Sequence, residues 1–170
     1  NECVELVNTL NCLNLKGNHE DYFIYGRCNV SNQIVQEFFQ MNYVNFNKKK
    51  IIENYQEEIL FNNFVFRHNI KSKDYIFIDT KVSVKNNLII GHSHQQYIRD
   101  INKFKLINPG SIGQNRKNLN LSNYIIWDLE KNKFFLREMV INNEIMIKEL
   151  KARKFPKICI NYLERKLNEI

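Results

Sequence analysis

The chain has little glycine and proline and no long apolar run. Only five glycines and two prolines occur in 170 residues, whereas 44% of the residues are hydrophobic and 25% are charged. This composition excludes disordered, collagen-like and linker-type chains. No apolar stretch approaches the ~20 residues that a membrane span needs, and the first residues do not resemble a signal peptide. We therefore expect a soluble, cytoplasmic protein whose residues 1–170 form a single domain with its own core and no membrane partner.

Cysteine pairs of the kind that bind zinc are also missing. The four cysteines are scattered and form no C-x-x-C motif: Cys3, Cys12, Cys28 and Cys159. We interpret them as reduced, mostly buried thiols in a reducing compartment, and we expect neither disulfides nor zinc at these positions.

The net charge of +7 is not organised like a nucleic-acid-binding surface. Apart from "NKKK" at 47–50 the lysines are dispersed, and aromatic residues do not alternate with them. A basic nucleic-acid-binding module is therefore an alternative that rests on charge alone, and we do not expect specific nucleic-acid binding.

Hydrophobic periodicity predicts strands mixed with helices. A helix is predicted near residues 1–10, a short strand at 12–16, and one or two helices within 30–61. Further strands are predicted at 64–68, at 87–92, and at 103–111 before a Pro-Gly turn. A hairpin turning at Lys131-Asn132 is predicted over 123–141, and helix from about 144 onward. This order of elements favours an α/β sandwich.

The chain has only four histidines, and each follows the end of a predicted apolar strand. They are His19, His68, His92 and His94. Ligand sites of α/β sheets lie at this edge, and imidazole is the commonest metal-ligating side chain. On an extended chain, residues i and i+2 face the same way about 6.5 Å apart. Such a spacing suits two metal ions better than one, so His92 and His94 predict a two-metal site.

The string "GNHE … H … GHSH … NPGSIGQNR" resembles the calcineurin-like metallophosphoesterases, in particular their small bacterial and archaeal phosphodiesterase branch. The flanking segments "NECVELV" and "FLREMV … MIKELKARKFPKICINYLERKL" resemble the same branch, so the resemblance covers essentially the whole chain. It implies a four-layer α/β/β/α sandwich and a phosphoester hydrolase, either a phosphodiesterase or a phosphatase.

The resemblance also implies a role for each polar residue of the motifs. Asn18, His68 and His92 would bind the second metal ion, and His94 would bind the first. His19 would be the general acid that protonates the leaving-group oxygen, with Glu20 orienting it.

Arg116 and the turn at 108–113 lie where the resemblance implies a site for the substrate phosphate. For Arg116 a solvated or structural role is an equally good interpretation.

Two divalent ions would be the cofactors implied by the resemblance. Manganese is the first expectation, and iron, zinc, nickel and magnesium also fit. Together they would lower the pKa of a bridging water and position the hydroxide for in-line attack on a small phosphoester or nucleotide substrate. A homo-oligomer is compatible with the sequence.

Two motifs of the family are missing. The family carries Asp-x-His and Gly-Asp on its first two strands, yet no Asp precedes Asp21 and no His precedes His19. We expect the chain to be the C-terminal three-quarters of such an enzyme, without its first strand–helix–strand portion. The first ion would keep only His94, so we expect exposed apolar surface, weak metal binding and little activity in this chain alone. A non-catalytic protein-interaction scaffold of the same fold is the main alternative.

Overall fold

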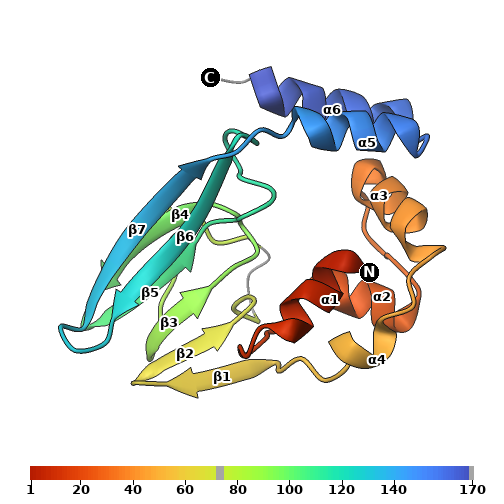
Figure 1. Cartoon of the computed structure of the whole chain (residues 1–170). Coiled ribbons are helices and arrows are strands. Elements are labelled where there is room, and N and C mark those ends of the chain that lie inside the picture. Colours follow the sequence, from red (N-terminus) through yellow and green to blue (C-terminus); the bar gives the residue numbers. More distant parts are fainter. Residues whose placement is uncertain (72–74, 169–170) are drawn as a thin grey trace.

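The computed structural model describes residues 1–71 and 75–168 (Figure 1). The helices are α1 (Glu2–Thr9), α2 (Asn18–Tyr25), α3 (Gln33–Tyr43), α4 (Lys49–Ile52), α5 (Glu144–Ala152) and α6 (Lys157–Asn168). The strands are β1 (Glu58–Phe61), β2 (Phe64–Arg67), β3 (Asn87–Ile90), β4 (Gln96–Ile101), β5 (Phe104–Pro109), β6 (Leu121–Asp128) and β7 (Lys133–Val140). The α/β class predicted from the sequence is confirmed.

The larger sheet has five strands in the order β1-β2-β3-β5-β4. Its three middle strands, β2, β3 and β5, run parallel, while β1 and β4 pair antiparallel at the two edges. Because the middle strands are parallel, their carboxyl ends meet along one edge of the sheet, where α/β proteins place their ligands.

The hairpin of β6 and β7 forms a second sheet that lies against one face of the first (Figure 1). Trp127 of β6 joins them: its ring centroid is 5.0 Å from that of Phe64 and 6.4 Å from that of Phe66, both on β2. Alternate residues of a strand face the same side, so these phenylalanines face the hairpin and Val65 faces away.

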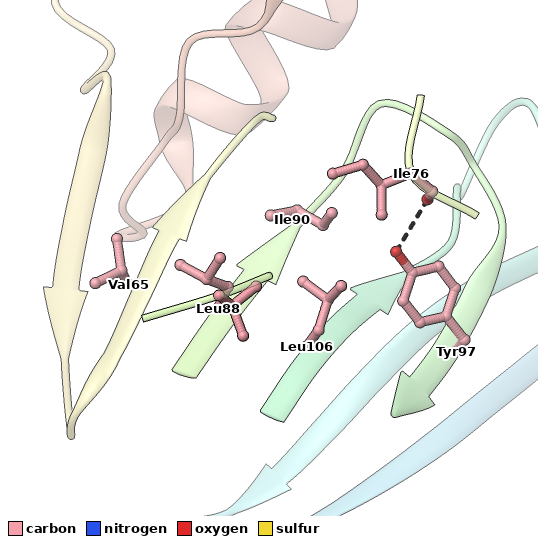
Figure 2. Close-up of a cluster of buried hydrophobic side chains, with 7 residues drawn as sticks. Val65, Ile76, Leu88, Ile90, Tyr97 and Leu106 are labelled. Atoms are coloured by element: carbon pink, nitrogen blue, oxygen red, sulfur yellow. Dashed lines mark hydrogen bonds between the residues drawn. The ribbon is translucent and has the colours of Figure 1, made fainter. Parts of the chain in front are cut away.

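Val65 belongs to the core on the opposite face (Figure 2). There Leu88, Ile90 and Leu106 pack together with Ile76, which comes from residues 75–86. This segment forms neither helix nor strand. The buried hydroxyl of Tyr97 donates a hydrogen bond of 2.9 Å to the Ile76 carbonyl, which ties the segment to β4 (Figure 2).

The helices form a second core beside the sheets. Phe23 of α2 packs edge-on against Phe39 of α3, with ring centroids 5.3 Å apart. Phe38, on the same helix, contacts a cluster that includes Leu150 of α5 and Leu163 of α6. The helical tail is interrupted before Pro156, which cannot donate a helical hydrogen bond.

Most predicted elements are confirmed, and two predictions are wrong. Residues 12–16 form no strand. In the described part of the chain, Leu15 makes one isolated bridge, to Gln56, and no ladder extends from it. Residues 58–61 are strand β1 instead of helix. Asn62 and Asn63 both have positive φ, 44° and 65°, and form a two-residue turn that folds β1 onto β2.

Two elements were not predicted: α2, which begins in the GNHE motif, and the edge strand β4. The cysteines also differ from expectation. All four are free thiols, but only Cys159 is buried, while Cys3 and Cys12 are exposed.

Apolar surface is exposed, as expected. α1 has no buried residue, and Leu6 and Leu10 at its end are 64% and 55% exposed. Within residues 1–71 and 75–168, no helix has the length and apolar character needed to cross a membrane.

Candidate metal and phosphoester site

Three segments that are distant in sequence meet at the carboxyl edge of the larger sheet. His68 follows the last residue of β2, and the loop Gly91–His94 follows the last residue of the neighbouring parallel strand β3. The Gly91 amide donates to the His68 carbonyl at 3.1 Å and ties these two ends together. The first turn of α2 brings Asn18 to the same place.

Three polar atoms form a compact triangle there. The Asn18 Oδ1 atom lies 2.8 Å from His68 Nε2 and 3.1 Å from His92 Nδ1, and the two imidazole nitrogens are 3.0 Å apart. Two ligand atoms that each lie about 2.1 Å from one ion are about 3.0 Å apart along an octahedral edge. The triangle therefore has the dimensions of one face of a metal coordination shell.

The glycine before Asn18 makes this approach possible. A Cβ atom on Gly17 would lie 2.9 Å from the Cε1 and Nδ1 atoms of the His68 ring. The Gly17 amide donates to the Glu20 carboxylate at 2.7 Å, which closes the first turn of α2 as a helix cap. Glu20 was predicted to orient His19. Its carboxylate accepts the Gly17 hydrogen bond and its charge raises the pKa of His19, while the orienting role stays a prediction.

Tyr22 determines how the Asn18 amide is turned. The Asn18 Nδ2 group donates to the Tyr22 hydroxyl at 3.1 Å, so the oxygen of the amide faces the two histidines. The two residues are four positions apart on α2 and share one helix face. Sequence reasoning missed Tyr22 because it did not predict a helix starting at residue 18.

His94 lies outside the triangle. Its Nδ1 atom is 2.8 Å from the carbonyl oxygen of Gln114. A backbone carbonyl at one ring nitrogen fixes the tautomer and leaves the other nitrogen as a ligand atom, an arrangement that metal-binding histidines commonly use.

The prediction that His92 and His94 face the same way on an extended chain was wrong. The two residues do not lie on extended chain, because both have left-handed backbone, with φ of 62° and 56°. Their rings reach different partners: His92 contacts Asn18 and His68, whereas His94 contacts Gln114. Positive φ at non-glycine residues stores strain and is concentrated at functional sites.

His19 lines the same cavity as the triangle and His94. Its ring lies edge-on to Tyr22, with centroids 5.4 Å apart. The protein packed around the ring lowers the pKa of His19, and the Glu20 charge opposes this effect, although part of the residue remains exposed.

Burial lowers the pKa of two further histidines, His68 and His94. It lowers the pKa of His68 to about 4, and the charges of His19 and His94 act in the same direction. Burial also lowers the pKa of His94, although the bond to Gln114 opposes it. A metal ion binds only the neutral form of imidazole, so these shifts favour coordination at neutral pH.

Arg116 lines the cavity and is held by contacts within the protein. Its Nε group donates to the Ser93 carbonyl at 3.0 Å, and its guanidinium lies over the rings of Tyr75 and Phe77 at 5.2 and 5.6 Å. Tyr75 in turn stacks on His92, with centroids 4.4 Å apart. Arg116 thus has structural contacts in addition to its place in the cavity wall.

The predicted phosphate-binding turn also supports the histidine loop. Asn108 is fully buried, and its amide donates to the Gly91 carbonyl at 2.7 Å and to the Ser93 hydroxyl at 3.0 Å. Its oxygen accepts from the Gly110 amide at 2.9 Å. Gly110 has φ of 84°, as the Pro-Gly turn requires.

The donor set fits one divalent ion more completely than two. Among the described residues, no group of three or more His, Cys, Asp or Glu side chains could hold a metal ion. The triangle has two imidazoles, and its third donor is the amide oxygen of Asn18, a residue type outside that set. The described residues bring only His94 to the expected other ion, so the two-ion centre stays a prediction.

Comparison with known proteins identifies the family. Residues 2–132 match the family model of the calcineurin-like phosphoesterase superfamily domain, and the chain belongs to this superfamily. The matched model is that of a phosphoesterase domain.

One curated relative is an uncharacterised protein of Methanocaldococcus jannaschii, 30% identical over 171 residues. The match covers 75% of this chain and 65% of that protein. The chain therefore spans about two thirds of the length of the relative that it matches.

Two solved structures share the fold. The crystal structure of a metallophosphoesterase from Sphaerobacter thermophilus has a TM-score of 0.72 and 17% identity, covering 96% of this chain and 81% of that one. A hypothetical protein from Pyrococcus horikoshii OT3 also has a TM-score of 0.72, at 12% identity, covering 95% of this chain and 76% of the other.

Proposed function

We propose that the cavity lined by Asn18, His68, His92 and His94 is part of the active site of a metal-dependent phosphodiesterase or phosphatase. The triangle of Asn18, His68 and His92 carries this proposal, because its three donor atoms are spaced as ligands of a single ion. His94, held by Gln114, would contribute to a second ion together with carboxylate ligands from outside the described residues.

Bound divalent ions, with manganese as the first expectation, would supply Lewis-acid polarisation of the phosphoester and a nucleophile at neutral pH. Neighbouring residues hold the candidate ligands in place. Tyr22 and Gln114 orient Asn18 and His94, and burial keeps His68 neutral. Stacked Tyr75 limits the movement of His92.

His19 is our candidate for the general acid, and the negative charge of a substrate phosphate would favour the protonated form that this role requires. Without substrate, burial lowers the pKa of His19, and this disfavours the protonated form that a general acid needs. The negative charge of a substrate phosphate beside the ring would act in the opposite direction, since a nearby negative charge stabilises imidazolium. Glu20 adds a smaller effect of the same sign.

Manganese binding by single alanine variants tests the proposal. In isothermal titration calorimetry, N18A, H68A and H92A should each weaken Mn²⁺ binding by about tenfold or more, because each removes one donor of three. H94A is the matched control and should change this affinity by less than about twofold. Equal affinity in all four variants would contradict the assignment of the triangle.

The number of ions separates the hydrolase from the scaffold alternative. Elemental analysis of the full-length protein should find about two divalent ions per chain if it is an enzyme. A full-length protein that binds no metal would support a non-catalytic scaffold of the same fold.

A further inference from the structure

Tyr75 lies flat against the ring of His92. The two rings are within 15° of parallel, and their centroids are 4.4 Å apart. Tyr75 lines the same cavity as the triangle and is 49% exposed. Its ring therefore contacts one of the candidate ligands without being part of the group of ligand atoms.

The local conformation of His92 does not fix the direction of its ring. The torsion about the Cβ–Cγ bond of a histidine has broad, two-fold preferences, so rotamer preference alone leaves the ring plane open. The backbone of His92 is also left-handed, with φ of 62°, a costly conformation that needs support from its surroundings. A flat partner restricts the ring plane, and the contacts of Nδ1 with Asn18 and His68 select one of the two orientations within it.

The backbone that follows Tyr75 is anchored to the protein. Ile76 is 1% exposed, and its carbonyl accepts the hydrogen bond of the Tyr97 hydroxyl (Figure 2). The Phe77 amide donates to the Thr80 hydroxyl at 2.9 Å. Tyr75 therefore projects from a fixed segment, although this segment is neither helix nor strand.

Arg116 joins the tyrosine to the loop that carries His92. Its guanidinium lies over the ring of Tyr75 at 5.2 Å and over that of Phe77 at 5.6 Å, and these two rings are parallel to within 10°. Its Nε group donates at 3.0 Å to the carbonyl of Ser93, the residue after His92. One side chain thus contacts both the stacking ring and the backbone beside the stacked imidazole.

We propose that Tyr75 and Arg116 form a clamp that fixes the ring of His92 with its Nδ1 atom toward Asn18 and His68. Tyr75 is then a positioning residue, and Arg116 acts through it. This role rests on the proposed function, which makes His92 a metal ligand. Every contact of the clamp joins two described residues, so the clamp requires no assumption about what else covers the cavity.

A clamped ring should bind a metal ion more tightly than a ring that turns freely. A ligand that already points toward the ion does not lose conformational freedom when the ion binds, and this preorganisation raises affinity. The interaction within an aromatic pair corresponds to a change of about twofold to tenfold in an equilibrium constant. Loss of the Tyr75 ring should therefore weaken Mn²⁺ binding by about fivefold.

Isothermal titration calorimetry of the 170-residue chain with Mn²⁺ measures this effect. Tyr75→Leu removes the aromatic ring and should show the fivefold loss, whereas Tyr75→Phe keeps the ring and should stay within about twofold of the parent. Tyr124→Leu is the matched control, since Tyr124 lies on β6 and is 38% exposed, and it should bind Mn²⁺ like the parent. Parental affinity in Tyr75→Leu, or an equal loss in Tyr75→Phe, would overturn the proposal.

NMR of the metal-free chain separates a change in ring direction from a general loss of structure. The ring current of Tyr75 should shift the carbon-bound ring protons of His92 upfield in the parent and in Tyr75→Phe. In Tyr75→Leu this shift should disappear, while the midpoint of thermal unfolding stays close to that of Tyr124→Leu. Unchanged His92 signals together with a lowered midpoint would show a merely structural role and overturn the clamp.

Arg116→Lys tests the second half of the clamp and is also the variant to use if Tyr75→Leu does not fold. It keeps the positive charge near the ion but loses the planar guanidinium and the Nε donor. It should weaken Mn²⁺ binding by about threefold, and the double variant with Tyr75→Leu should be within about twofold of Tyr75→Leu alone. Parental affinity in Arg116→Lys, or losses that multiply in the double variant, would overturn the clamp.

Mn²⁺ binding by the parent chain distinguishes failure of the clamp from failure of the proposed function. A parent that binds no Mn²⁺ would contradict the metal site, and the His92 signals of Tyr75→Leu would still support or overturn the clamp. Mn²⁺ binding that is lost in His68→Ala but unchanged in Tyr75→Leu would support the metal site and overturn the clamp.

Discussion

The side-chain amide of Asn108 donates a 2.7 Å hydrogen bond to the carbonyl of Gly91, the residue that precedes His92. Asn108 lies on β5 and Gly91 follows β3, so the bond joins the ends of two neighbouring parallel strands. The turn at 108–113, which the sequence predicted as a site for the substrate phosphate, thus supports the loop that carries His92 and His94. This relationship makes Asn108 a positioning residue with a measurable effect.

Asn108→Ala should destabilise the fold. The change leaves the Gly91 carbonyl and the Gly110 amide without their partner in a buried region. We expect a loss of about 2–3 kcal/mol in the free energy of unfolding, measured by urea denaturation. Asn86→Ala, at an exposed position, is the control and should stay within about 0.5 kcal/mol of the parent. Equal stability of the two variants would contradict the role of Asn108.

Tyr22→Phe should weaken metal binding without unfolding the chain. Loss of the hydroxyl allows the Asn18 amide to turn its nitrogen toward His68 and His92, while the ring keeps its contact with Phe39 at 6.4 Å. Removing such an orienting partner typically lowers metal affinity about tenfold or more. Mn²⁺ titration measures the affinity, and thermal unfolding of the metal-free chain should be unchanged.

Tyr25→Phe is the matched control for that experiment, because Tyr25 lies on the same helix and is 68% exposed. It should bind Mn²⁺ like the parent chain. A Tyr22→Phe variant with parental Mn²⁺ affinity would show that the hydroxyl does not position Asn18.

The pKa of His68 predicts how the stability of the metal-free chain depends on pH. The pKa is about 4 in the folded chain, against 6.5 for an unperturbed histidine, so the unfolded state binds the proton more readily between these limits. The stabilising contribution of the neutral ring is complete above about pH 6.5 and is lost as the pH falls toward 4. The full shift corresponds to about 3 kcal/mol, and solvent screening reduces the expected loss to about 1–2 kcal/mol.

Urea denaturation at a series of pH values measures this loss, with His68→Gln as the comparison. His19 and His94 shift in the same direction, so the difference between the parent and the variant isolates His68. The variant should lose less stability than the parent between pH 6.5 and pH 4. Identical pH profiles would show that His68 is not protonated on unfolding in this range.

The sequence predicted the strands that carry the site but not all of the local geometry. β2 and β3 were recognised because short apolar runs end at polar residues, and the histidines after them meet at one edge as expected. The prediction of a strand at 12–16 was wrong because alternation alone does not supply a partner strand, and among the described residues Leu15 has one isolated bridge, to Gln56. The helix that begins at Asn18 was not predicted, because its capping residues, Gly17 and Glu20, were interpreted as parts of a site.

Side chains that act from a distance in sequence could not be predicted. Tyr75 stacks on His92 from a segment without helical or strand periodicity, so no local pattern marks it. His92 and His94 have left-handed backbone, and the loop that carries them bonds to Asn108 and to the Gln114 carbonyl, partners that only the folded chain brings into place. The sequence therefore predicted that the histidines meet at one edge of the sheet, but not the directions of their rings.

The 170-residue chain alone should be a weak catalyst. Within the described residues, three donors surround one ion position, whereas the other is offered only His94, and a single imidazole does not hold an ion firmly. With a 4-nitrophenyl phosphodiester and Mn²⁺, we expect release of nitrophenolate close to the rate of a His92→Ala control. The same assay on the full-length protein should show manganese-dependent turnover. Saturable, Mn²⁺-dependent turnover by the 170-residue chain that disappears in His92→Ala would contradict this prediction, because it would show that the described donors suffice for catalysis.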